Sequence, residues 1–138
     1  MQLAAELDAR LLRLYRLIGR DAGRDLSRTA SSVLATLRDG GPKRITELAA
    51  SEAIAQPSVT TLVGRLERDG LVHRAPDPAD ARAVLVHLTD AGRERLAAMR
   101  ASRTAVVEER LRALTADERG LLESALPALD KLIDGETQ

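Results

Sequence analysis

A run of small polar and basic side chains lies in the stretch QPSVTTLVGR, between Gln56 and Arg65. Gln, Ser, Thr and Arg are side chains that hydrogen-bond to the edges of DNA bases and to phosphates. Proline is best tolerated in the first turn of a helix, so Pro57 predicts a helix that begins behind Gln56. At helical period, two faces result: polar Gln56, Ser58, Thr60, Thr61 and Arg65, and apolar Val59, Leu62, Val63 and Leu66. We therefore expect this helix to place its first turns in the major groove of DNA.

A second set of candidate residues lies in the stretch PDPADAR, residues 76–82. An arginine at the tip of a hairpin suits a narrow minor groove, where the potential of DNA is most negative, and Arg82 is expected to enter it. Asp80 is expected to hold the Arg82 guanidinium through a charge-assisted pair. Thr46 and Arg74 are weaker candidates for phosphate contacts. Taken singly, each residue is better explained by helix capping or a solvated charge, so the hypothesis depends on the whole set.

The sequence offers little to other chemistry. It has no cysteine, which excludes disulfides, thiolate metal sites and thiol redox switches, and only two histidines, His73 and His87. We find no Ser-His-Asp arrangement, no glycine-rich phosphate loop and no convincing pair of carboxylates, so neither an enzyme nor a cofactor or metal site is expected. His73 and His87 are expected to face each other across a hairpin, in packing or through a hydrogen bond.

The helices that would carry these residues are read from apolar spacing and capping residues. A first helix is predicted over 3–24, with a leucine seam, and a second over 28–38, capped within Asp25–Ser27 and ended by RDGGP. Thr46 is the expected N-cap of a short helix over 47–53, and the recognition helix follows at about 57–69. Thr89 is expected to cap a helix over 90–114, and Thr115 to Glu118 form a capping box for the last helix. Pro127 lies inside that helix and is expected to kink it.

Alternating apolar residues at 84–88 predict a strand, with LVHRA (71–75) as its partner and residues 76–82 as the connecting loop. The fold class is therefore mainly α, a winged helix-turn-helix with about six helices and a two-stranded β-hairpin wing at 76–83. We expect a DNA-binding lobe over 28–92 and a dimerisation region formed by 1–27 and 110–138. The long helix over 90–114 would link them.

Within the helix-turn-helix, Ala49 is the small residue expected where the two helices approach, with Leu48, Ile54, Val59 and Leu62 around it. Ala53 stands at the turn where glycine is often found, and Glu52 at a place that is usually less polar.

Composition and charge are compatible with this class. The net charge is zero, from 21 basic and 21 acidic residues, but residues 10–28 carry six Arg against two Asp, and residues 115–138 carry six acids against two bases. A basic region can bind a polyanion in a neutral protein. The core has to be aliphatic, because the chain has one Tyr and no Phe or Trp. No apolar run is long enough for a signal peptide or a membrane span, so a cytoplasmic protein without membrane contact is expected.

The segment from Gln56 to Gly92 resembles the core of the MarR family of bacterial transcription regulators. Besides the recognition helix, the similarity covers a Leu-Glu-x-x-Gly-Leu-Val transition, an Asp-x-Arg wing and a Leu-Thr-x-x-Gly entry into the next helix. These motifs fall on Leu66, Glu67, Gly70, Leu71, Val72, Asp80, Arg82, Leu88, Thr89 and Gly92.

The resemblance implies an obligate homodimer with interlocking N- and C-terminal helices, which binds a pseudo-palindromic operator in double-stranded DNA. It also implies DNA contacts at Pro57, Ser58, Thr61 and, in the wing, Arg82. A repressor released by a small lipophilic or anionic effector is the expected mode of action. Tyr15 is the only side chain available for stacking, so the sequence excludes an aromatic cage for that effector. The alternative is a winged-helix module for protein–protein interaction without specific DNA binding, and a metal-sensing repressor is poorly supported.

Overall fold

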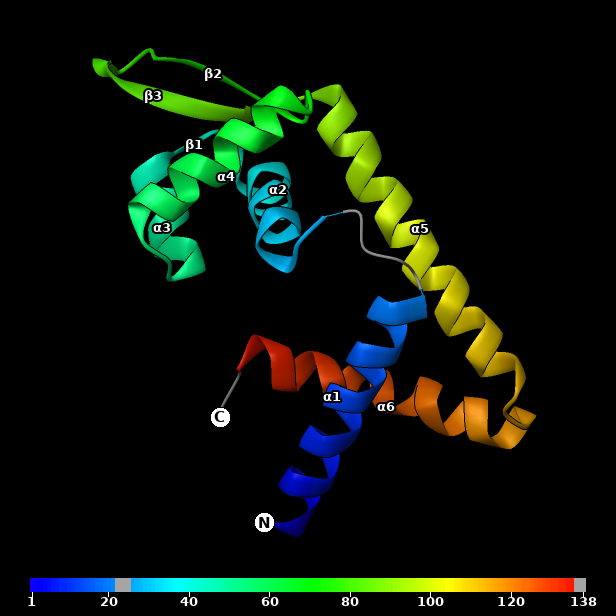
Figure 1. The fold of residues 1–138 in the computed structure, drawn as a ribbon. Helices are drawn as coiled ribbons and strands as arrows, with labels where there is room; N and C mark the ends of the chain where they lie inside the picture. Colours follow the sequence, from blue (N-terminus) through cyan, green and yellow to red (C-terminus); the bar gives the residue numbers. More distant parts are fainter. Residues whose placement is uncertain (22–25, 136–138) are drawn as a thin grey trace. The chain divides into compact units, whose positions relative to one another are not determined.

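The computed structural model describes residues 1–21 and 26–135, which form six helices and a three-stranded antiparallel sheet (Figure 1). The mainly α winged-helix prediction is confirmed. In chain order the elements are α1 (Gln2–Asp21), α2 (Arg28–Gly40), β1 (Lys43–Arg44), α3 (Ile45–Glu52), α4 (Gln56–Arg68), β2 (Val72–Asp77), β3 (Asp80–Leu88), α5 (Asp90–Arg112) and α6 (Ala116–Asp134). They divide into two compact units, one over 22–102 and one made of 1–21 with 103–138.

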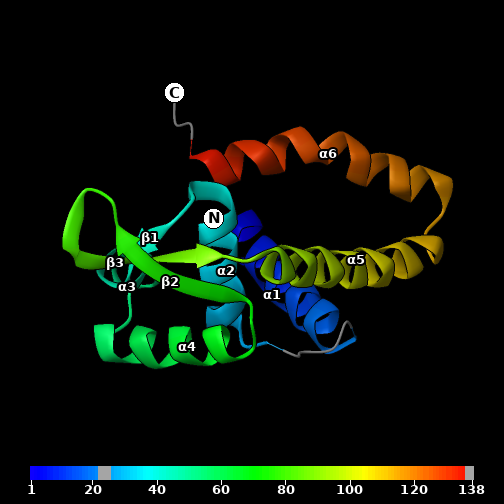
Figure 2. The same cartoon turned by 90° about the horizontal axis from the view of Figure 1, so that it is seen from above.

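The unit over 22–102, the winged-helix lobe, has a purely aliphatic core. Helices α2, α3 and α4 gather on one side of the β2–β3 hairpin (Figures 1 and 2). No polar or charged side chain is buried among the residues that the structure describes. The buried core residues are Ala30, Val33, Leu34, Leu37, Leu48, Val59, Val63, Leu66, Leu71, Val72, Val86, Leu88 and Leu96. Leu26, Ile45, Ala49, Ile54 and Leu62 pack against them.

Three of the predicted helix caps are confirmed. Ser27 Oγ accepts from the Ala30 amide at 3.1 Å at the start of α2, and Thr89 Oγ1 accepts from the Gly92 amide at 3.0 Å at the start of α5. Thr115 and Glu118 form the expected capping box of α6, in which Pro127 lies as predicted. The predicted capping role of Asp25 lies outside the described residues.

The start of α3 was predicted wrongly. Thr46 is not the N-cap, because α3 already begins at Ile45 and Arg44 takes the N-cap position. The Arg44 amide donates to Glu47 Oε1 at 3.1 Å, so the cap is supplied from within the helix and not by a preceding hydroxyl. Residues Lys43 and Arg44 form β1, which pairs with Val86 and Leu85 of β3. This pairing holds the chain extended up to the first turn of α3.

The hairpin is longer than the sequence predicted. Residues 76–82 are not a loop, since β2 continues to Asp77 and β3 starts at Asp80. Asp77 faces Asp80 and Pro76 faces Val84, so residues 81–83 of β3 have no opposite residue and form a bulge. His73 and His87 do face each other across the hairpin, with stacked rings whose centroids are 4.8 Å apart.

A close junction joins the end of α4, the hairpin and α5. Thr89 Oγ1 donates to the Gly70 carbonyl at 2.6 Å, and the Thr89 amide donates to the Leu71 carbonyl at 3.1 Å. Gly92 lies directly against this junction: an added Cβ would overlap the Leu71 carbonyl oxygen and lie 2.5 Å from Leu88 Cδ1. The Leu-Thr-x-x-Gly motif is therefore a packing device that sets α5 against the lobe.

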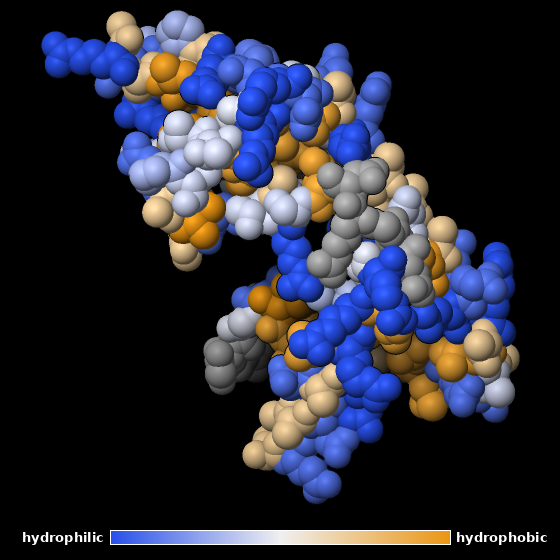
Figure 3. All heavy atoms as spheres, viewed as in Figure 1, coloured by the Kyte–Doolittle hydropathy of each residue, from blue (hydrophilic) through white to orange (hydrophobic). Residues whose placement is uncertain are grey.

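Helices α1 and α6 belong to the second unit, the terminal-helix unit, and leave most of their large apolar side chains exposed. Leu3 is 65% exposed, Leu121 72% and Ile133 80%. Orange side chains lie among blue ones on the surface of this unit in Figure 3. The exposed apolar residues of the unit are Met1, Leu3, Leu11, Leu12, Leu14, Tyr15, Leu121, Leu122, Leu126, Leu132 and Ile133. None of the helices in the described part of the chain has the length and apolar character needed to cross a membrane.

The junction at Gly92 gives a first prediction. Gly92→Ala should lower the free energy of unfolding by about 1–3 kcal/mol, because the new methyl group overlaps backbone that cannot move aside. Gly64→Ala in α4 is the matched control: its Cβ would lie 3.6 Å from Arg74 Nη2, an ordinary contact, so we expect a gain of about 0.5–1 kcal/mol. Urea unfolding followed by circular dichroism measures both, and equal effects would contradict the overlap.

The turn between α3 and α4 gives a second prediction. Ala53 has φ 52° and ψ 42°, a left-handed conformation that costs a non-glycine residue about 1–2 kcal/mol. Ala53→Gly should therefore raise the free energy of unfolding by about 0.5–1 kcal/mol, after the greater freedom of glycine in the unfolded chain is subtracted. Ala50→Gly, inside α3, should lower the same quantity by about 1 kcal/mol. Thermal unfolding distinguishes the two signs.

Candidate nucleic-acid interface

Helix α4 buries one face and exposes the opposite one. Val59, Val63 and Leu66 are buried in the lobe core, and Leu62 is half-buried. The predicted contact residues Gln56, Pro57, Ser58, Thr60, Thr61 and Arg65 are all exposed. The structure therefore brings the polar set together on one surface, with its direction fixed by the buried set. The helix begins at Gln56 and ends at Arg68, each one residue before the predicted bounds.

The side chains on this surface have no structural task that would explain them. The N-cap of α4 is Ala55, and no side chain caps the helix, so Gln56 and Ser58 are not capping residues. Among the described residues, the side chains of Gln56, Ser58 and Arg65 have no hydrogen-bond or ion-pair partner. Thr60 and Thr61 donate their hydroxyls back to the Gln56 and Pro57 carbonyls, at 3.0 and 3.1 Å. Their oxygens keep lone pairs that can accept, and their methyl groups remain apolar contacts.

The first turn of α4 offers fewer free amides than a typical helix start. Pro57 has no amide hydrogen, and the Ser58 and Val59 amides both donate to the Ala55 carbonyl, at 3.0 and 3.2 Å. The Gln56 amide is the donor of this turn that remains for an anion. Binding through this helix therefore has to come mainly from side chains.

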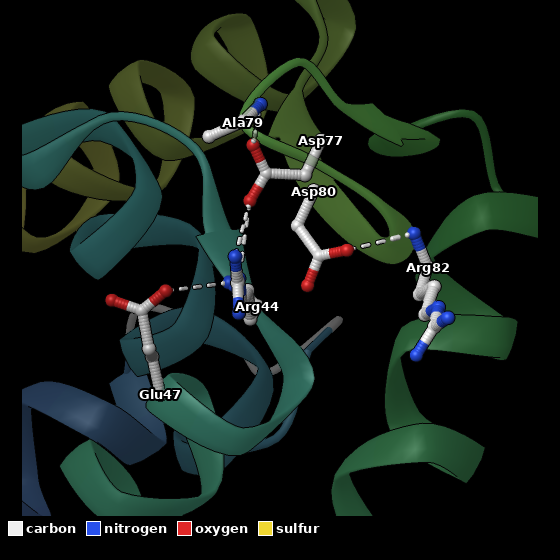
Figure 4. A network of polar contacts seen from close by, with 6 residues as sticks. All are labelled: Arg44, Glu47, Asp77, Ala79, Asp80 and Arg82. Atoms are coloured by element: carbon white, nitrogen blue, oxygen red, sulfur yellow. Dashed lines mark hydrogen bonds and ion pairs between the residues drawn. The ribbon is translucent and has the colours of Figure 1, made fainter.

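The wing places Arg82 inside the β3 bulge, not at the tip of a loop. The two-residue tip is Pro78 and Ala79, and bulges commonly redirect a side chain. The expected pair between Asp80 and the Arg82 guanidinium is absent from the ion pairs of the described residues. Asp80 Oδ1 instead accepts from the Arg82 backbone amide at 3.0 Å (Figure 4). Asp80 therefore shapes the backbone of the bulge and leaves the guanidinium free to contact another molecule.

Arg44 and Asp77 form an ion pair at the base of the wing tip that sequence reasoning missed. Arg44 Nε and Nη2 donate to Asp77 Oδ2 at 3.1 and 2.7 Å, and the Ala79 amide donates to Asp77 Oδ1 at 2.9 Å (Figure 4). The Ala79 amide, followed by Arg44, lowers the pKa of the Asp77 carboxyl below its ordinary value. The same pair raises the pKa of Arg44. Both groups are therefore fully charged at neutral pH.

Thr46 and Arg74, the two weaker candidates for phosphate contacts, differ in whether their side chains already have a partner. Thr46 is exposed in the first turn of α3, and its side chain has no partner among the described residues. Arg74 is held against α4, because its amide donates to Glu67 Oε2 at 3.1 Å and its Nε lies 3.5 Å from Glu67 Oε1. A phosphate would have to compete with Glu67 for Arg74. Glu67, a residue of the Leu-Glu-x-x-Gly-Leu-Val motif, thus ties α4 to β2.

Part of what was missed had a signal in the sequence. Asp77-Pro78-Ala79 is a typical Asx turn, in which the aspartate accepts from the amide two residues on. The role of Arg44 had no such signal, since a two-residue strand shows no periodicity. Glu52 is half-buried, and the Ser32 hydroxyl donates to its Oε1 at 2.8 Å, which provides a partner for a carboxylate at a usually apolar position. Across residues 1–21 and 26–135, no group of three metal-binding side chains is present.

Comparison with known proteins finds a matching family and several similar regulators. The model of the MarR family matches residues 26–84. The transcriptional regulator MT0903.1 of Mycobacterium tuberculosis is 35% identical over 96% of this chain and 94% of its own length. The transcriptional repressor NicR of Pseudomonas putida is 37% identical over 75% of this chain and 63% of its own length. A crystal structure of a Pseudomonas aeruginosa protein is 33% identical with a TM-score of 0.84, covering 99% of this chain and 96% of the other.

These similarities extend over the lobe and the terminal helices, well beyond α4 and the hairpin. Together with the winged-helix architecture, they show that the chain belongs to the MarR family of helix-turn-helix transcriptional regulators.

Proposed function

We propose that this protein is a sequence-specific DNA-binding regulator that places α4 in the major groove and the wing in the adjacent minor groove. The observation that carries the proposal is the exposed polar row of α4, which has no structural task and whose direction is fixed by Val59, Val63 and Leu66. Gln56 is suited to adenine, which it can bond with two hydrogen bonds, and Arg65 to guanine or phosphate. Thr60 and Thr61 would act as acceptors and as methyl contacts for thymine, because their hydroxyl hydrogens are used inside the helix.

Arg82 would supply the wing contact. Its exposed guanidinium has no partner in the described part of the chain, and the narrow minor groove attracts cations. Pro57 and Ser58 lie at the leading end of α4 and would approach the DNA backbone most closely. Thr46 would add a phosphate contact from α3, and Arg74 a weaker one.

We further propose that the functional unit is a homodimer built from the terminal-helix unit. The two apolar seams predicted from the sequence lie mostly open to solvent in the single chain: Leu3, Leu11 and Leu14 on α1, and Leu122, Leu126 and Ile133 on α6. Exposed apolar area of this extent marks an association surface. A twofold dimer would present two winged helices to a pseudo-palindromic operator, with half-sites about 34–36 Å apart. We also propose a cytoplasmic location, because the similar regulators are bacterial and the bacterial chromosome lies in the cytoplasm.

Repression is the mode of action we propose, because NicR, the similar protein from Pseudomonas putida, is a transcriptional repressor. Release by a small lipophilic or anionic effector stays a prediction. Thermal-shift screening against small carboxylic acids checks it, and no shift with any of them would remove it.

The competing proposal is a winged helix that binds another protein. The neutral balance of residues 56–88, with four Arg and four acids, favours it slightly. Arg82 in the wing and the polar first turn of α4 favour DNA, because Arg, Gln, Ser and Thr can hydrogen-bond to base edges and phosphates.

In vitro selection from a random duplex library tests DNA binding directly. We expect enrichment of a pseudo-palindromic sequence, with an affinity that falls steeply as salt rises, since several phosphates are neutralised. For the enriched duplex, Arg82→Ala should weaken binding about tenfold, because one desolvated charge contact is lost. Arg38→Ala, which removes an arginine paired with Asp39 on α2, is the control and should leave affinity unchanged. Failure of the wild-type protein to enrich any duplex would favour the protein-binding alternative.

Light scattering coupled to gel filtration tests the dimer. The wild-type protein should elute with twice the chain mass of 14.9 kDa. Replacing Leu122 and Leu126 by Asp should weaken association at least about a hundredfold, because each leucine loses about 1.5–3 kcal/mol of burial. Val84→Asp, on the wing, is the matched control at an exposed apolar position and should remain dimeric. A monomeric wild-type protein would contradict the proposal.

A further inference from the structure

The ion pair between Arg44 and Asp77 joins parts of the lobe that are distant in sequence and not neighbours in the sheet. The two residues are 33 positions apart. The strand order is β1-β3-β2, so the pair reaches from one edge strand to the other across β3. One Asp77 oxygen receives two donors from Arg44, and the other receives the Ala79 amide. A single carboxylate therefore connects the start of α3 with the turn at the wing tip.

The pair is sheltered enough to hold its geometry. The side chain of Asp77 is only 11% exposed, while that of Arg44 is 40% exposed. Partial burial reduces the screening of such a pair by salt, and two donors on one oxygen fix the direction of the guanidinium. The carboxylate of Asp77 is far less exposed than that of Asp39, whose side chain is 69% exposed in its pair with Arg38.

The position of Asp77 controls the segment that carries Arg82. Asp77 faces Asp80 at the last rung of the hairpin, and the bulge over 81–83 begins directly after that rung. Asp80 in turn accepts from the Arg82 amide. A hairpin of this size is marginally stable by itself, so its far end needs an attachment to keep one conformation. The chain of contacts from Arg44 through Asp77 and Asp80 to Arg82 provides that attachment (Figure 4).

The charges near the wing tip give a second reason why the pair between Arg44 and Asp77 would matter for DNA binding. Asp77 and Asp80 are anions close to the segment that would approach DNA phosphates, and like charges there oppose binding. The positive charge of the Arg44 guanidinium offsets the negative charge of Asp77 within the protein.

We propose that Arg44 and Asp77 form a latch that positions Arg82 for its contact with DNA, although neither residue belongs to the recognition helix or to the bulge. This inference rests on the proposed DNA-binding function and assigns positioning residues to it.

The decisive variant is Asp77→Asn, because the latch and simple electrostatics predict opposite results. Removing an anion near DNA should strengthen binding if charge alone matters, whereas loss of the latch should weaken it. Asn can still accept from the Ala79 amide, so the turn is kept while the charge-assisted contact to Arg44 is lost. With the duplex enriched by selection, fluorescence anisotropy should show about tenfold weaker binding for Asp77→Asn. Asp39→Asn is the matched control in the same lobe and should bind as tightly as wild type or slightly more tightly.

A double-mutant cycle shows whether Asp77 acts through Arg82. In the Arg82→Ala background, Asp77→Asn should change affinity less than about twofold, since the residue to be positioned is gone. Arg44→Gln should reproduce the loss from the other side of the pair, and Arg44→Gln with Asp77→Asn should lose no more than either alone. Additive effects of Asp77→Asn and Arg82→Ala, or tighter binding by Asp77→Asn, would overturn the latch.

Hydrogen exchange on the DNA-free protein gives a readout that needs no operator. Amides of residues 79–84 should exchange faster in Asp77→Asn and Arg44→Gln than in wild type, while the urea midpoint of the lobe stays the same. Unchanged exchange in this segment would overturn the latch whatever DNA is bound. A wild-type protein that enriches no duplex would instead overturn the proposed function, so the two failures can be told apart.

Discussion

The surface chemistry of the lobe depends on which face of α4 is buried. Val59, Val63 and Leu66 are completely or almost completely removed from solvent, and each aliphatic side chain of this size gains about 1.5–3 kcal/mol from burial. Rotating α4 to expose them would forfeit that energy. Its opposite face therefore has a fixed direction, which is the requirement for any surface that reads another molecule by hydrogen bonds. Because the core is aliphatic, no buried polar side chain in the described part of the chain competes with this arrangement.

Polar contacts do a different job in this lobe: they set the positions of parts that the core does not reach. Thr89 joins the end of α4 to the start of α5 through Gly70 and Leu71, and Glu67 ties α4 to β2 through Arg74. Arg44 and Asp77 connect β1 to the wing tip. The accepting oxygens belong to the turn after α4 at Gly70 and Leu71, to the last turn of α4 at Glu67, and to the end of β2 at Asp77. The aliphatic core thus orients the helix, and the polar contacts orient the wing.

The sequence predicted the elements that follow a repeating pattern, and it did not predict individual contacts between residues distant in the chain. The order of helices, the hairpin and the caps at Ser27, Thr89 and Thr115 follow from periodicity and from hydroxyl residues placed before apolar runs. The cap of α3 could not be read in this way, because Arg44 offers only its backbone amide there. The length of the hairpin was underestimated because Pro and Asp, which favour turns, also occur at the bulged end of these strands.

In the candidate site, too, the patterned residues were predicted and the individual contacts were not. The exposed polar face of α4 could be predicted, because polar and apolar residues recur there with the period of a helix. The contact between Asp80 and Arg82 was anticipated, but its chemistry was not: spacing of two residues fits both a side-chain pair and an aspartate that accepts from a backbone amide. The partnership of Arg44 with Asp77 depends on three-dimensional strand order, which no local spacing encodes.

The aliphatic core also decides how this protein can be observed. With no tryptophan and a single tyrosine, Tyr15 on α1, the winged-helix lobe carries no intrinsic fluorophore of its own. Tyrosine fluorescence will report on the surroundings of α1 and will not report directly on changes at α4 or the wing. The fluorescence of a tryptophan introduced at a chosen position would consequently be measured against the emission of one tyrosine alone.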